Sequence, residues 1–115
     1  MRNKTLTSKE RLIHISTSVE KINTYTQELS FDQFVADQMA HEACMYQFMI
    51  IGEAIIHVDD SYLNKYDYPW YKVRAFRNIL AHEYFGISLE AIWDVIQMDL
   101  PKLKIVVDSM LKNEF

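Results

Sequence analysis

The scarcity of turn-forming residues is the feature that most limits how this chain can fold. Its 115 residues include only two glycines, Gly52 and Gly86, and two prolines, Pro69 and Pro101. A β-sandwich or a β-barrel would need a turn signal roughly every ten residues. The sequence therefore disfavours an all-β fold and favours helices that are joined by short connections.

Apolar residues at three-, four- and seven-residue spacings predict two helices in the first half of the chain. The first begins near Ser8. Its apolar stripe consists of Leu12, Ile15, Val19, Ile22 and Leu29. The second begins after Ser30, which forms a possible capping box with Gln33, and it runs as one long helix to Val58. Gly52 lies inside this second helix, where we expect it to permit a close helix contact.

Two further helices are predicted in the second half of the chain. Pro69 suits the first position of a third helix, which is expected to stop near Gly86, a residue that tolerates the left-handed conformation common after helix ends. Its inward-facing residues are predicted to be Trp70, Val73, Phe76, Ile79 and Leu80. A fourth helix follows Ser88, and Pro101 is expected to kink it or to restart it after Asp99.

These four main helices predict an all-α fold, an up-and-down bundle in one domain over residues 1–115, with a proline kink in the last helix. A chain of this length, of which 50% is hydrophobic, can close one core. Cys44 is its one cysteine, which excludes an internal disulfide and a thiolate zinc site and fits a reducing cytoplasm. Neither a signal peptide nor an apolar run of about 20 residues is present, so we expect a cytoplasmic protein without a membrane partner.

Charge is distributed unevenly along the sequence. The net charge of −4 argues against a protein that holds nucleic acid by bulk electrostatics. Between Ile22 and Asn64 there is no Lys or Arg, so this acidic stretch forms either solvated helix faces or a surface for a basic partner. Residues 65–82 reverse the balance, and an anion site is expected there. The charged residues of this segment are Lys65, Lys72, Arg74 and Arg77, against Asp67 alone.

Arg77 and His82 are the candidate catalytic pair within this basic segment. At about 100° per residue they lie roughly 140° apart around a helix, but near a helix end both side chains could lean into one cleft. A histidine can take the proton from an RNA 2′-hydroxyl, and an arginine can stabilise the charge on the phosphate, without a metal ion. The spacing by itself also fits an arginine that is ion-paired to a neighbour such as Glu83 and a histidine that caps a helix end.

Other polar residues leave alternatives open. Glu53 lies in a largely apolar helix, which favours a structural salt bridge, although it could also orient the arginine or bridge to a partner subunit. His57 lies near Asp59 and Asp60, but the dipole at a helix end favours a histidine without any ligand role, so we expect no metal site. The tyrosine-rich connection in residues 62–71 could stack unpaired bases or pack over the end of the bundle.

The sequence around the arginine and histidine resembles a known family. Arg77, His82 and Tyr84 are similar to the Arg-x4-His-x-Tyr motif of HepT-like toxins in the HEPN superfamily. Four further segments resemble those of the family in order and spacing. They are Ile51-Gly52-Glu53-Ala54, Pro69-Trp70, Trp93 and Leu100-Pro101. Phe76 departs from the pattern, because the family often has methionine before the arginine, but an apolar replacement should preserve the packing.

The resemblance implies a ribonuclease toxin of a type VII-like toxin-antitoxin system that cleaves RNA without a metal or other cofactor. Arg77 and His82 would be catalytic, and Asn78 would help to place Arg77 or the phosphate, with Glu53 in a supporting role. The chain would form a homodimer in which the motif helices face one another, so that one copy supplies half a site.

The resemblance also implies a protein partner. Tyr84 would be the residue that a minimal nucleotidyltransferase antitoxin of the MntA type modifies with AMP, and the dimer could assemble further with that antitoxin. The modification would add bulk and negative charge where the RNA phosphate must lie. The alternative is a non-catalytic helical adaptor or substrate-binding module for a nucleotidyltransferase. The presence of Arg77, His82 and Tyr84 favours the ribonuclease.

Overall fold

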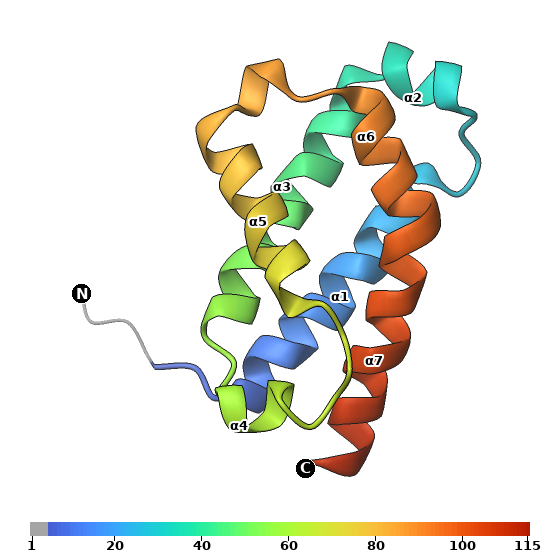
Figure 1. Ribbon diagram of the computed structural model, residues 1–115. Helices are drawn as coiled ribbons and strands as arrows, with labels where there is room; N and C mark the ends of the chain where they lie inside the picture. The colour runs from blue at the N-terminus through green and yellow to red at the C-terminus, as the bar shows by residue number, and fades with distance from the viewer. Residues whose placement is uncertain (1–4) are drawn as a thin grey trace.

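The computed structural model describes residues 5–115, which contain helices and connections but no strand (Figure 1). The predicted all-α fold is confirmed. The helices are α1 (Ser8–Thr26), α2 (Phe31–Ala36), α3 (Gln38–Ile56), α4 (Asp60–Leu63), α5 (Trp70–His82), α6 (Leu89–Asp94) and α7 (Leu100–Asn113). A 3₁₀ turn, η1 (Tyr84–Gly86), follows α5, and a π-helical turn, η2 (Val95–Asp99), joins α6 to α7.

Helix α3 is the central element of the bundle. It packs against both α1 and α5, and α1 also packs against α7. Figure 1 shows α1, α3, α5 and the continuous α6–η2–α7 segment as the long elements, with α2 and α4 as short helices at opposite ends. Cys44 lies in the core on α3, where burial raises the pKa of its thiol to about 12. Within residues 5–115, no helix has both the length and the apolar content that crossing a bilayer requires.

The predicted second helix is wrong in one respect, because Asp37 divides it into α2 and α3. Asp37 leaves the helical conformation, with φ −100° and ψ 89°, and its carboxylate accepts a hydrogen bond from the backbone N–H of Ala40 at 3.0 Å. An aspartate side chain competes with the helix for backbone N–H donors in this way. The spacing of apolar residues cannot reveal a helix break that involves one residue. Val35 and Met39, which flank the break, are 42% and 84% exposed. The capping box at Ser30 is confirmed.

Pro101 causes an irregularity in the last helix, but the helix does not stop there. The turn η2 lies just before it, and the N–H of Leu100 donates to the carbonyl of Val95, five residues back. Proline lacks an N–H, and its ring clashes with the carbonyl four residues earlier, here that of Gln97. The wider π turn accommodates both defects, so the predicted kink or restart takes the form of a π-helical turn.

The end of the third helix also differs from the prediction. Helix α5 ends at His82, and the chain continues through the η1 turn to Gly86. No residue in the described part of the chain has a positive φ, so the left-handed conformation expected at Gly86 is absent. Ile79, which was expected to point inward, is 45% exposed. Only Trp70 and Leu80 are fully buried on this helix, so its buried stripe is narrower than its apolar content suggests.

Gly52 permits a close helix contact, as the sequence predicts, and the structure shows that this contact is between α3 and α5. A Cβ atom placed on Gly52 would overlap the Cβ and Cγ atoms of Arg77 and would lie 3.4 Å from the Arg77 Cα atom. These are the parts of the arginine nearest its backbone, which cannot swing away as the guanidinium could. The missing side chain at Gly52 therefore lets the stem of Arg77 lie directly on α3.

We expect Gly52→Ala to lower the free energy of unfolding. Overpacking costs about 1–3 kcal/mol, and the overlap with the Arg77 stem places Gly52→Ala in the upper part of that range, about 2–3 kcal/mol. The gain in helix propensity offsets about 0.5–1 kcal/mol, so the net loss should be about 1–2.5 kcal/mol. Urea denaturation followed by circular dichroism measures it. Gly86→Ala is the matched control, because a Cβ there meets nothing within 4 Å. Equal stability of the two variants would contradict the close contact.

Candidate active site on helix α5

Arg77 reaches from α5 across to α3, and both ends of its guanidinium are held. Its Nη2 atom donates to Glu53 Oε2 at 2.9 Å, and its Nη1 atom donates to the side-chain oxygen of Asn78 at 3.2 Å. The side chain is 28% exposed, and its Nε atom is buried with no hydrogen-bond partner in residues 5–115. The structure thus brings together three predicted site residues, Arg77, Asn78 and Glu53, and leaves the guanidinium partly open to solvent.

Glu53 forms the predicted salt bridge, and its partner is Arg77. The neighbour that the alternative suggested for Arg77, Glu83, is not its partner. The other carboxylate oxygen of Glu53 lies 3.4 Å from Nε2 of His57, one helical turn later. The hydrogen bond from Arg77, with a smaller contribution from His57, lowers the pKa of Glu53 below its ordinary value. The carboxylate therefore stays charged to a lower pH than an ordinary glutamate does, and this extends the pH range of its pair with Arg77.

His57 was not expected to belong to this network. The four-residue spacing from Glu53 on one helix is the signal that could have identified the contact, because residues i and i+4 are neighbours on a helix surface. In the described part of the chain, no three His, Cys, Asp or Glu side chains are placed to hold a metal ion. His57 instead contacts the acid that holds Arg77.

His82 is the last residue of α5, and it is exposed. Within residues 5–115 it makes no hydrogen bond or ion pair, whereas Arg77 is turned toward α3. Among residues 5–115, no hydrogen bond or ion pair joins the side chains of Arg77 and His82. One helix carries both side chains, and a cleft common to them stays a prediction.

Tyr84 lies immediately beyond His82, in the η1 turn. It is half-buried against the core, and its ring contacts that of Phe85 edge-on, with the ring centroids 5.2 Å apart. Phe85 is 98% exposed. The turn thus holds the predicted modification site, Tyr84, at the same end of α5 as His82.

The basic segment 65–82 does not form one anion-binding patch. Three of its four basic residues are paired with acids on other elements. The pairs are Lys65 with Glu114 at 2.8 Å, Arg74 with Asp60 at 3.4 Å, and Arg77 with Glu53 at 2.9 Å. Lys72 alone has no acidic partner among residues 5–115. The expected local positive charge is largely compensated, a fact that local sequence could not reveal because the acids come from distant segments.

The tyrosine-rich connection packs over the end of the bundle, which was one of its two predicted roles. Its aromatic rings contact other rings, or a carboxylate at the C-terminal end of α7. These contacts are Tyr62 with Phe115 (ring centroids 5.0 Å apart), Tyr68 with Trp70 (4.8 Å) and the Tyr66 hydroxyl with Glu114 (2.9 Å). The indole N–H of Trp70 also donates to the carbonyl of Leu63 at 3.0 Å. These contacts fix the start of α5 against the bundle.

Comparisons with known proteins agree with the motif. A protein of Methanocaldococcus jannaschii, whose name joins a gamma-glutamylcyclotransferase to a proposed RNase, is 37% identical over 94 residues. This match covers 81% of the present chain but only 42% of that longer protein. A proposed RNase of Caldanaerobacter subterraneus is 31% identical over 109 residues, which are 94% of this chain and 97% of that protein.

A third relative comes from Thermococcus cleftensis and bears the name "Probable ribonuclease HepT". It is 30% identical over 97 residues, which cover 84% of this chain and 88% of that protein. No solved structure gave a significant match. The model of the HepT-like ribonuclease family matches residues 15–110, which is most of the sequence. The chain therefore belongs to the HepT-like ribonuclease family.

Proposed function

We propose that this protein is a toxin of a type VII-like toxin-antitoxin system and that it cleaves RNA in the cytoplasm without a metal ion. The observation that carries the proposal is the position of the Arg77 guanidinium, which Glu53 of α3 and Asn78 of α5 hold in place. The helix that carries Arg77 ends in His82, whose exposed side chain has no hydrogen-bond or ion-pair partner among residues 5–115. Together with membership of a ribonuclease family, this arrangement offers a phosphate-binding cation and a titratable base.

In this mechanism His82 transfers protons, and Arg77 stabilises negative charge on the phosphate. The imidazole takes the proton from the 2′-hydroxyl, whose oxygen attacks the neighbouring phosphorus, and the bond to the 5′-oxygen breaks. The departing 5′-oxygen takes up a proton from an imidazolium. Arg77 stabilises the negative charge that grows on the phosphate oxygens, and its planar fork can contact two of them. Glu53 and Asn78 position the guanidinium, so little ordering is needed when RNA binds.

The complete site is a homodimer. Within one chain Arg77 turns toward Glu53 on α3, and no hydrogen bond or ion pair among residues 5–115 joins it to His82, so a second copy of α5 would complete the site. The outer surface of α3, α5 and the η1 turn exposes large apolar side chains. They are Tyr46, Ile56, Tyr71, Ile79 and Phe85. Helical spacing places Tyr46 on the same side of α3 as Glu53, and Tyr71 on the same side of α5 as Asn78 and His82. Exposed apolar groups of this kind mark protein interfaces, and isologous pairing of α5 with its copy joins two half-sites.

AMP transfer to Tyr84 by a minimal nucleotidyltransferase antitoxin of the MntA type neutralises the toxin. Tyr84 is two residues from His82, and the exposed Phe85 beside it gives an enzyme an apolar group to hold. A nucleotide on this tyrosine would place negative charge where the RNA phosphate must approach, so repulsion and bulk both block the site.

Purified, unmodified protein should degrade RNA in the presence of a chelator. Both His82→Ala and Arg77→Ala should slow cleavage by about 100-fold or more, because the first removes a positioned proton-transfer group and the second removes a group that stabilises the developing charge. Gel analysis of a labelled RNA measures the rates. His14→Ala and Arg74→Ala are matched controls, because His14 is exposed on α1, and Arg74, which lies on α5, is paired with Asp60 of α4. They should cleave as the wild type does.

Circular dichroism confirms that each variant is folded. If the folded wild type is inert toward total RNA and harmless when expressed alone, the chain is instead a helical adaptor for a nucleotidyltransferase.

Co-expression with the cognate nucleotidyltransferase should add the mass of one or more AMP units to the peptide that contains Tyr84 and should abolish RNA cleavage. Peptide mass spectrometry locates the modification. Tyr84→Phe should remain unmodified and active under the same conditions, whereas Tyr71→Phe, a change at an exposed tyrosine on α5, should still be modified. AMP on any other residue would show that the assignment to Tyr84 is wrong.

A further inference from the structure

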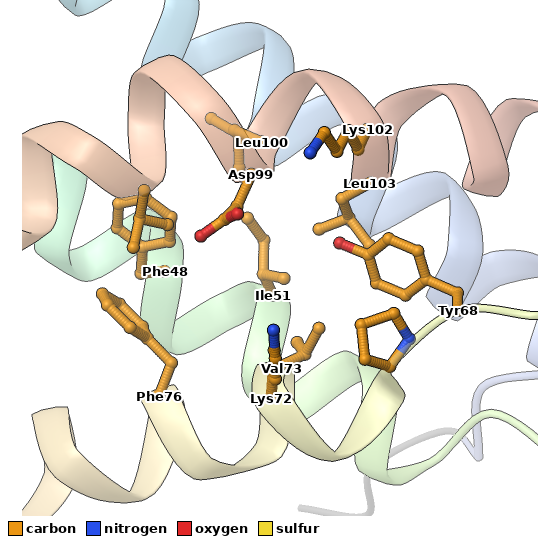
Figure 2. Close-up of a pocket in the computed structure, with 12 residues that line it drawn as sticks. Phe48, Ile51, Tyr68, Lys72, Val73, Phe76, Asp99, Leu100, Lys102 and Leu103 are labelled. Carbon is orange, nitrogen blue, oxygen red and sulfur yellow. The ribbon is translucent and has the colours of Figure 1, made fainter.

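A pocket of about 320 Å³ opens between α3, α5 and the start of α7 (Figure 2). Its inner walls are apolar, and they come from all three elements. The wall residues are Phe48, Ile51, Val73, Phe76, Leu100 and Leu103. The rings of Phe48 and Phe76 contact each other with their centroids 5.0 Å apart, so an aromatic surface forms one end. Neither Arg77 nor His82 lines the pocket, which lies on another side of α5 from the contact with Glu53.

Four polar side chains surround this apolar space. Figure 2 shows the Tyr68 hydroxyl, the Asp99 carboxylate and the amines of Lys72 and Lys102 around one opening. In the described part of the chain, none of the four makes a hydrogen bond or an ion pair, whereas Lys65 and Lys104 are paired. Burial and the nearby charge of Asp99 raise the pKa of Tyr68, so its hydroxyl stays protonated and can donate. The pocket opening therefore offers hydrogen-bond donors and acceptors that a ligand could engage.

The π-helical turn helps to form this opening. Val95 and Asp99, the first and last residues of the turn, both line the pocket, and Leu100 follows directly. A π turn widens the helix locally and changes the direction in which the following side chains project, and such turns are frequent at functional sites. The turn that accommodates Pro101 thus also places Asp99 at the pocket opening.

The size and chemistry of the pocket indicate the class of ligand. A cavity of about 150 Å³ holds benzene, and small-molecule sites begin at about 300 Å³, so a volume near 320 Å³ suits a ligand of about two fused rings. The aromatic end favours a flat ring. The two unpaired lysines favour an anionic group, and Asp99 can accept a hydrogen bond from a ring N–H or an amine.

We propose that this pocket binds a planar bicyclic aromatic molecule that carries an anionic group, with its ring against Phe48 and Phe76 and its anion near Lys72 and Lys102. A purine nucleotide and an aromatic acid share this chemistry. The site is separate from the proposed RNA-cleaving residues, and its test does not depend on RNA cleavage.

Methyl-labelled, full-length protein titrated in an NMR experiment tests the proposal. The probes are naphthalene-2-sulfonate, AMP and adenosine, which supply a bicyclic acid, a purine with an anion and a purine without one. We expect saturable shifts at the methyl groups of Ile51, Val73, Leu100 and Leu103, and none at Ile22, which is buried outside the pocket on α1. If AMP binds more tightly than adenosine, the ligand class is a purine nucleotide. If only naphthalene-2-sulfonate binds, the ligand class is an aromatic acid.

The double variant Lys72→Gln/Lys102→Gln should bind naphthalene-2-sulfonate about five- to tenfold more weakly, as expected for the loss of two exposed charge contacts. Lys112→Gln, a change at an exposed lysine on α7 outside the pocket, should bind as the wild type does. The absence of saturable shifts at the pocket methyls with any probe at millimolar concentration would overturn the proposal. Equal affinity of the double variant and the wild type for both anionic probes would also overturn it.

Discussion

The close contact between α3 and α5 at Gly52 is the constraint on which the candidate site depends. Because Gly52 has no side chain, the stem of Arg77 lies on α3, and its guanidinium reaches the carboxylate of the adjacent Glu53. The Glu53 side chain is 50% exposed, and a pair this open contributes only about 0–1 kcal/mol to stability. The ion pair therefore orients the arginine, whereas the buried contacts of α3 with α1 and α5 hold the helices together.

Helix α5 separates two regions of different chemistry. Toward α3 it presents Arg77 within a polar network, and toward the π turn and α7 it presents Val73 and Phe76 to an apolar pocket. Its buried stripe is narrow, so several of its residues remain available for contacts outside the chain. This distribution leaves room on one helix for the proposed catalytic residues, the proposed dimer surface and the pocket.

Much of the fold could be predicted because helical periodicity and the shortage of breakers both point to an all-α bundle. The break at Asp37 and the π turn before Pro101 could not be predicted, because each depends on how one residue resolves a local hydrogen-bond conflict. At the site, the apolar sequence around Glu53 predicts a salt bridge, and the salt bridge forms even though the Glu53 side chain is 50% exposed. The charge compensation of the basic segment was not, because the acids Asp60 and Glu114 meet it only through the fold.

The chemistry assigned to Arg77 and His82 is most directly tested by the ends of the RNA fragments that the protein produces in the presence of a chelator. Attack by the 2′-oxygen without a metal leaves a 2′,3′-cyclic phosphate on one fragment and a 5′-hydroxyl on the other, and mass spectrometry of a short, defined RNA distinguishes these ends. We expect the wild-type protein to produce 2′,3′-cyclic phosphate ends. Fragments with 3′-hydroxyl and 5′-phosphate ends would contradict it, because they require water as the attacking nucleophile.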